Sequence, residues 1–75
     1  MVEFIVLVEG QRTGLGTHAF QTAPHVGDYI SMNDREGKGQ AYKVKAVVHA
    51  SDGKGDLIVE HVGTETELLS RLLPG

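Results

Sequence analysis

Four histidines are the residues in this chain best suited to chemistry. His18, His25, His49 and His61 lie in a chain of 75 residues with a formal net charge of -3. Imidazole is a common metal ligand, and three histidines can hold a catalytic zinc ion. No His-x-His or His-x-x-x-His pair occurs, so no local motif brings two rings together. The sequence favours ordinary structural histidines, keeps a His-based metal site as a remote alternative, and predicts no cofactor.

Acid–base and nucleophilic chemistry has only isolated candidates. Asp28 follows His25, and Asp52 follows His49. Neither pair sits in a motif such as the nucleophile elbow, and a small barrel leaves little volume for an enclosed pocket. Both aspartates are better explained as turn formers beside glycine. We expect no enzyme activity, including from the hydroxyl groups of Ser31, Ser51 and Ser70.

Residues 10–16, GQRTGLG, contain three glycines and could be read as a phosphate-binding loop. Such loops work when a helix begins directly after them and a Lys-Ser/Thr pair is present. Here a strand-like run follows and that pair is missing. A flexible hairpin connection is the better interpretation, with Arg12 at its tip able to meet an anionic partner.

A local group of basic residues suggests a single-stranded nucleic-acid-binding surface as the alternative function. Small barrels bind single strands through a basic groove and aromatic platforms. Acidic Asp34 and Glu36 interrupt this group, and the isoelectric point near 5.7 gives no global basic field. A solvated charged face is therefore favoured. The candidate residues are Arg35, Lys38, Lys43 and Lys45, with Tyr29 as the stacking ring.

Composition narrows the remaining possibilities. The chain has no Cys, which excludes disulfides and Cys-type zinc sites. The apolar run at residues 2–8 contains Glu3, follows no basic segment, and is too short to span a bilayer. We expect a cytoplasmic protein that does not bind membranes.

Residues 41–62 predict an antiparallel hairpin. Two β-rich runs flank a turn at residues 51–55 that contains Asp-Gly, a strong hairpin signal. A turn centred on Gly53 and Lys54 would pair Val48 with Val59. One face would then be the core and the other a charged face with an apolar strip. The core positions are Tyr42, Val44, Ala46, Val48, Leu57, Val59 and His61, and the strip is Val47, Ile58 and Val62.

Three further strands precede this hairpin. Residues 1–9 are rich in β-branched side chains and apolar on both faces, which is typical of a strand buried on two sides. Residues 17–22 predict a second strand that pairs antiparallel with the first. After the Pro24 to Asp28 turn, residues 29–32 predict a third strand.

Residues 64–73 predict a C-terminal helix. Thr64 and Glu67 have the spacing of a capping box, in which the Thr64 hydroxyl accepts from the Glu67 amide and Glu67 reaches back to the Thr64 amide. A helix this short is marginal alone, so we expect it to dock on the apolar strip of the hairpin. Leu69 and Leu72 would face the hairpin, while Leu68 and Leu73 would flank that contact.

Together these elements predict one mainly β domain over residues 1–75: a five-stranded, bent antiparallel sheet or small barrel with a C-terminal helix. At the level of fold it resembles Src-homology-3-like barrels. The pattern Pro24-x-Val26-Gly27-Asp28-x-Ile30, followed by Tyr42-x-Val44-x-x-Val47-x-His49, is similar to short bacterial and phage proteins without a known activity. This resemblance implies a barrel and no catalytic residue.

The surplus of apolar side chains predicts the function class. One short helix cannot cover the outer faces of both the first strand and the hairpin, and an exposed apolar patch calls for a partner. We expect a non-catalytic interaction or scaffold module, self-associating or an accessory subunit, with a protein or a second copy as its partner. The predicted interaction surface is Val47, Ile58, Val62, Leu68, Leu69, Leu72 and Leu73.

Overall fold

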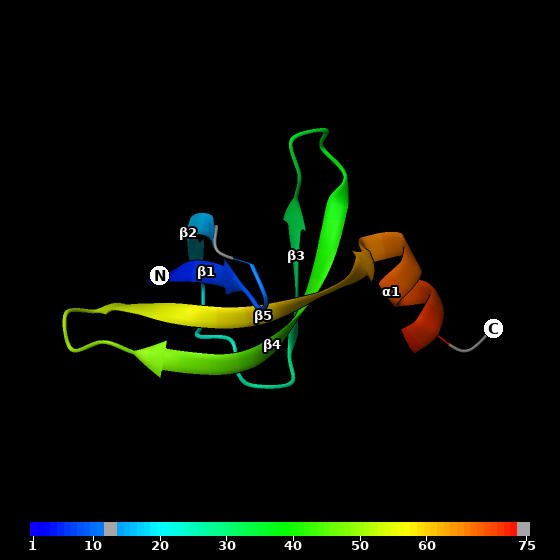
Figure 1. Ribbon diagram of the computed structural model, residues 1–75. Helices are drawn as coiled ribbons and strands as arrows, with labels where there is room; N and C mark the ends of the chain where they lie inside the picture. The colour runs from blue at the N-terminus through cyan, green and yellow to red at the C-terminus, as the bar shows by residue number, and fades with distance from the viewer. Residues whose placement is uncertain (12–13, 74–75) are drawn as a thin grey trace.

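The structure is a computed structural model, and it describes residues 1–11 and 14–73. Five strands form one sheet, in the order β2-β1-β5-β4-β3. The sheet curls into a half-barrel, and a single helix follows its last strand (Figure 1). The elements are β1 (Val2–Val8), β2 (Gly14–Phe20), β3 (Tyr29–Asn33), β4 (Gly39–His49), β5 (Lys54–Thr64) and α1 (Glu65–Leu72).

The prediction of a five-stranded bent β domain with a C-terminal helix is confirmed. One detail differs, because the sheet is mixed: β1 pairs antiparallel with β2 but parallel with β5. The β1–β2 hairpin therefore lies beside the β4–β5 hairpin and places β1 next to the centre of the sheet. β2 and β3 remain as the two edges, and the half-barrel is open between them.

The core lies on the concave face of this curled sheet. Alternate residues of β1 and β5 point into it, as the two-residue period of a strand requires. Ile5 and Leu7 point to the other face, and Ile5 is 40 % exposed, so β1 is buried mainly on one side rather than on two. The central cluster consists of Phe4, Val6, Val8, Tyr42, Val44, Leu57 and Val59.

The predicted register of the β4–β5 hairpin is wrong. Val48 pairs with Asp56, not with Val59, and Val59 pairs with Val44. Lys45 is an extra residue in β4 between two paired positions, which is a β-bulge. A bulge exchanges the two faces of a strand beyond it, so the predicted core residue Val48 is 50 % exposed.

The bulge also breaks up the predicted apolar strip. Val47 pairs with Leu57 and packs against the core, whereas Ile58 pairs with Ala46 on the outer face. Val62 is a second extra residue, in β5, near the start of α1. The three residues therefore do not form one strip.

Helix α1 begins where predicted. The Thr64 hydroxyl accepts from the Glu67 N–H at 3.1 Å, which confirms that half of the capping box. The other half differs, since the Glu67 carboxylate accepts from the Thr64 hydroxyl at 3.2 Å rather than from the Thr64 amide. Glu65 and Glu67 lie in the first turn and Arg71 in the last, which suits the helix dipole.

Helix α1 docks on the β4–β5 hairpin as predicted, but the predicted contact with the apolar strip is wrong. Helix α1 packs on β4 and β5 at the end of the hairpin opposite the turn at residues 50–54 (Figure 1). Val47 pairs with Leu57, which lies seven residues before the last residue of β5. This separation is about 23 Å along the strand, and a helix of this length does not reach so far. Of the leucines on α1, Leu68 is buried, at 8 % exposure, while Leu69 and Leu72 are 46 % and 52 % exposed.

Candidate functional site

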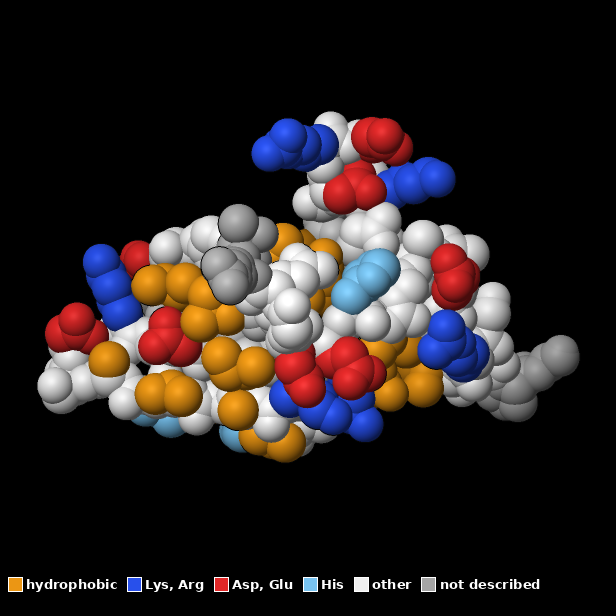
Figure 2. All heavy atoms as spheres, in the orientation of Figure 1, with side chains coloured by type: hydrophobic (Ala, Val, Ile, Leu, Met, Phe, Trp, Pro, Cys, Tyr) orange, Lys and Arg blue, Asp and Glu red, His pale blue; other side chains and the backbone are white. Residues whose placement is uncertain are grey.

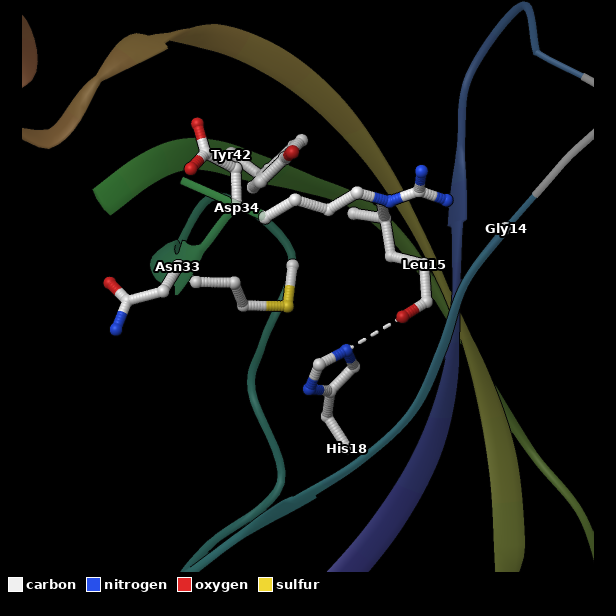
Figure 3. Close-up of a pocket in the computed structure, with 8 residues that line it drawn as sticks. Gly14, Leu15, His18, Asn33, Asp34 and Tyr42 are labelled. Atoms are coloured by element: carbon white, nitrogen blue, oxygen red, sulfur yellow. Dashed lines mark hydrogen bonds between the residues drawn. The ribbon is translucent and has the colours of Figure 1, made fainter. Parts of the chain in front are cut away.

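The half-barrel is open between its edge strands β2 and β3, and we call this opening the seam. It contains a hollow of about 440 Å³. Both edge strands contribute to it, together with the β3–β4 loop and β4. In Figure 3, Leu15 and His18 of β2 lie across this space from Asp34 and Tyr42, and the Asn33 amide is directed away from it. The hollow is lined by Gly14, Leu15, His18, Met32, Asn33, Asp34, Arg35 and Tyr42.

A second hollow of about 270 Å³ continues the first. The two share Leu15, Asp34 and Tyr42, so we treat them as one feature, the seam groove. The second hollow adds Gln40 and His61. Its remaining lining residues are Val8 and Gln11.

Leu15 reaches the seam groove because β2 carries a bulge there. Val6 pairs with Gly16 and Leu7 with Gly14, which leaves Leu15 as the extra residue. Gly16 has a φ of +85°, a conformation that favours glycine. A Cβ at Gly14 would stand 2.8 Å from the Val6 carbonyl oxygen. The glycine-rich segment is therefore partly a strand with a shaped bulge, and Arg12 lies outside the described residues.

Asp34 organises the β3–β4 loop beside the groove. Its Oδ1 accepts from the backbone N–H groups of Glu36 and Lys38, both at 2.9 Å, and its Oδ2 accepts from Gln40 Nε2 at 3.0 Å. The Gln40 hydrogen bond, followed by the backbone hydrogen bond from Lys38, holds the pKa of this carboxyl below its usual value of 3.8. Asp34 thus keeps its negative charge within the protein's own network.

The same network determines which ring nitrogen of His61 carries the hydrogen. Because Gln40 Nε2 donates to the acceptor Asp34, its Oε1 is the oxygen that lies 2.8 Å from His61 Nε2. An amide oxygen only accepts, so Nε2 of His61 carries the hydrogen and Nδ1 is left for another partner. His18 follows the same logic, since its Nε2 donates to the Leu15 carbonyl at 2.8 Å (Figure 3).

Tyr42 closes the floor of the groove. Tyr42 is 9 % exposed, and its ring lies 5.2 Å from the ring of His61, its cross-strand neighbour. Burial, and then the negative charge of Asp34, raise the pKa of the Tyr42 phenol. The phenol is therefore a neutral donor or acceptor at neutral pH, attached to an apolar ring.

The four histidines occupy three different surroundings. His18 and His61 line the seam groove, whereas the His49 ring packs edge-on against Phe4 with centroids 6.0 Å apart. His25 is exposed beside Asp28. Within residues 1–11 and 14–73, no three His, Asp or Glu side chains cluster closely enough to hold a metal ion.

The two His/Asp pairs are built as turns. Asp28 Oδ2 accepts from the His25 N–H at 2.8 Å, and Asp52 Oδ1 accepts from the Lys54 N–H at 3.1 Å. Both aspartates therefore stabilise local backbone, as predicted. The expectation that the chain is not an enzyme stays a prediction. The same holds for the expectation that the hydroxyl groups of Ser31, Ser51 and Ser70 have no catalytic role.

The basic residues of the nucleic-acid alternative lie in two places. Arg35 and Lys38 belong to the projecting β3–β4 loop, where Figure 2 shows cations and carboxylates side by side. Lys45 lies 3.8 Å from Glu60, and Lys43 pairs with Tyr29 on one side and Glu60 on the other. Nucleic-acid binding stays a prediction.

The second surface with a candidate function is on α1. Leu69, Leu72 and Leu73 are 46 %, 52 % and 64 % exposed, and we call them the leucine face. Leu68 is buried beside β4 and β5, where Ala41 is also fully buried. The structure thus brings the leucines of the predicted interaction surface together on α1 and its C-cap, and leaves Val47 and Ile58 elsewhere on the sheet.

The sequence did not predict the seam groove. The groove depends on two edge strands that are far apart in the chain, and on the sheet remaining open between them. One local signal was available: Leu15 between two glycines is a pattern that favours a bulge in a strand.

Comparison with protein-family models, with curated proteins and with solved structures found no match to this chain. The resemblance to Src-homology-3-like barrels therefore stays a prediction. In the described part of the chain, no helix is both long enough and apolar enough to cross a bilayer.

Proposed function

We propose that this chain is a non-catalytic, cytoplasmic interaction module that self-associates through the leucine face of α1. One observation carries the proposal: two of the three leucines on this eight-residue helix, and the leucine that caps its C-terminus, are about half exposed or more. Exposed apolar side chains are ordinary one by one, but three together on one short helix and its C-cap form a patch that a partner can bury.

The dipole of α1 favours a second copy as that partner. When two copies of a helix pack antiparallel, their helix dipoles oppose each other, which is a favourable arrangement. A two-fold axis between residues 70 and 71 would bring Leu69 opposite the partner's Leu72.

The expected affinity is modest. Complete burial of one leucine contributes about 1.5–3 kcal/mol, so six half-exposed leucines in a pair of chains contribute on the order of 5–9 kcal/mol. Loss of translational and rotational freedom opposes this by several kcal/mol. We expect a dissociation constant on the order of 0.1–1 mM, which suits a reversible scaffold contact.

Sedimentation equilibrium from about 50 µM to about 2 mM, a range that brackets this constant, tests the proposal. The wild-type chain should shift from monomer towards dimer across this range. Leu72→Lys places a charge in the leucine face and should keep the chain monomeric. Ser70→Lys adds the same charge to the same helix about 130° around its axis from the midpoint between Leu69 and Leu72, and should dimerise as the wild type does.

Two outcomes would contradict the proposal. A wild-type chain that stays monomeric through this range has no self-association of the proposed strength. If Ser70→Lys weakens the dimer as much as Leu72→Lys does, the effect is one of net charge and not of the leucine face.

A further inference from the structure

The seam groove has the features of a peptide-binding site, and neither the leucine face nor the rest of α1 contributes to its lining. Its apolar wall consists of Leu15, Met32 and the Tyr42 ring. Together the two hollows reach the size range in which proteins bind small ligands and single side chains. What enters the groove is decided by the polar groups around that wall.

Within residues 1–11 and 14–73, Arg35 is the permanently charged cation that lines the groove. Among the described residues, the ion pairs join His25 to Asp28 and Lys45 to Glu60, and Arg35 takes part in neither. The adjacent Asp34 already accepts three hydrogen bonds from Glu36, Lys38 and Gln40. The Arg35 guanidinium is thus available to a carboxylate from outside, which it can bind through two parallel hydrogen bonds.

Both walls of the groove are also sheet edges. β2 and β3 end the strand order, so each presents backbone N–H and C=O groups on its outer side to an incoming extended chain. Gly14 and Leu15 of β2, and Met32 and Asn33 of β3, line the groove itself. Peptides commonly bind in this way, with main-chain hydrogen bonds for affinity and a pocket for one side chain.

We propose that the seam groove binds the carboxyl terminus of a partner polypeptide whose last residue is apolar. The terminal carboxylate binds Arg35, the last side chain enters the hollow against Leu15, Met32 and Tyr42, and the preceding backbone lies along an edge strand. The Nδ1 atoms of His18 and His61, which have no hydrogen bond to other described residues, are polar positions for the peptide backbone.

The test is a titration followed by amide and side-chain chemical shifts with three small probes. These are acetyl-Ala-Leu with a free carboxyl group, the same dipeptide as its amide, and 4-methylpentanoate, which keeps the carboxylate and the branched chain without a backbone. Acetyl-Ala-Leu should shift signals of Leu15, His18, Met32 and Tyr42. The amide should bind at least about tenfold more weakly, because it lacks the charged partner of Arg35.

Two substitutions in one loop make the matched pair. Arg35→Gln should weaken acetyl-Ala-Leu binding about tenfold. Lys38→Gln removes the same charge from the same exposed loop, does not alter the groove lining, and keeps the backbone N–H that Asp34 accepts. It should leave binding unchanged.

Three results would overturn the proposal. The first is no shift at the groove residues up to the solubility limit of the free acid. The second is equal binding of acid and amide, or equal loss in Arg35→Gln and Lys38→Gln. The third is binding of 4-methylpentanoate as tight as that of acetyl-Ala-Leu, which would assign the groove to small carboxylic acids rather than to a polypeptide.

Discussion

Gly55 is the residue on which the aromatic packing of the sheet depends. It lies in β5 between Phe4 of β1 and His49 of β4, its neighbours in the two pairings. The rings of Phe4 and His49 meet there, because Gly55 has no side chain to separate them. His49 therefore has a packing role in the sheet.

Replacing Gly55 by alanine should destabilise the fold. The added Cβ would stand 2.7 Å from Phe4 Cε1 and 2.5 Å from the Val48 carbonyl oxygen, and Phe4 is fully buried. Overpacking of this kind costs about 1–3 kcal/mol in free energy of unfolding, measurable by urea denaturation. Lys54→Ala, at the exposed neighbouring position, should change it by less than about 0.5 kcal/mol. A Gly55→Ala chain as stable as the wild type would refute the packing described here.

Asp34 should make stability depend on acid pH. Its folded-state pKa lies below the ordinary 3.8 that it regains on unfolding, so its contribution to stability is complete above the unfolded value. This contribution is lost as pH falls through the lowered folded pKa. The melting temperature of the wild type should exceed that of Asp34→Asn at neutral pH, and the difference should shrink below about pH 4. A difference that stays constant down to pH 2 would contradict this role of Asp34.

At the scale of the element, α1 combines a well-formed start with little burial. Thr64 caps the helix, the Leu73 N–H closes its last turn on the Leu69 carbonyl at 2.9 Å, and only Leu68 is buried. Eight residues are too few for a stable isolated helix, so α1 depends on its cap and on its contact with β4 and β5.

Removing the cap should loosen the helix. Thr64→Ala loses the acceptor of the Glu67 N–H and the donor to the Glu67 carboxylate, which should cost about 1 kcal/mol of unfolding free energy. Amide hydrogen exchange across residues 67–72 should become faster in this variant than in the wild type. Thr66→Ala, an exposed change inside the helix, should not accelerate exchange. Equal protection in all three chains would show that the cap does not hold α1.

The sequence predicted those elements whose signals are local. The capping residues gave the start of α1, and turn-forming residues separated the strands. The pairing within the β4–β5 hairpin could not be predicted, since the Asp52-Gly53 turn belongs to a longer loop in which Ala50 N–H donates to the Lys54 carbonyl. The bulge at Lys45 also exchanges the core and outer faces of β4. A charged residue within a strand is not a sequence signal for a bulge.

At the scale of the whole molecule, the remaining features depend on contacts between distant segments. The parallel pairing of β1 with β5 joins residues about fifty positions apart, and it determines which strands remain as edges. The seam groove follows from those edges, and the leucine face follows from where α1 meets the sheet. Local patterns in the sequence carry little information about either one, which is why the sequence predicted the kinds of element better than the surfaces they create.

Disulfide exchange between two cysteine variants tests the antiparallel pairing of α1 most directly. The chain has no Cys, so Leu69→Cys and Leu72→Cys each introduce a single thiol into the leucine face. The two variants are mixed in equal amounts at about 1 mM, near the expected dissociation constant, in a glutathione buffer. Cross-linking requires the two Cα atoms to approach within roughly 4.4–6.8 Å, which the proposed two-fold axis provides for residues 69 and 72 of opposite copies.

The mixed disulfide between positions 69 and 72 should exceed its random proportion, while Ser70→Cys should not cross-link above background. Random proportions of the three disulfides, or none at all, would contradict self-association through the leucine face. An excess of the two symmetric disulfides would instead show that the helices pack parallel.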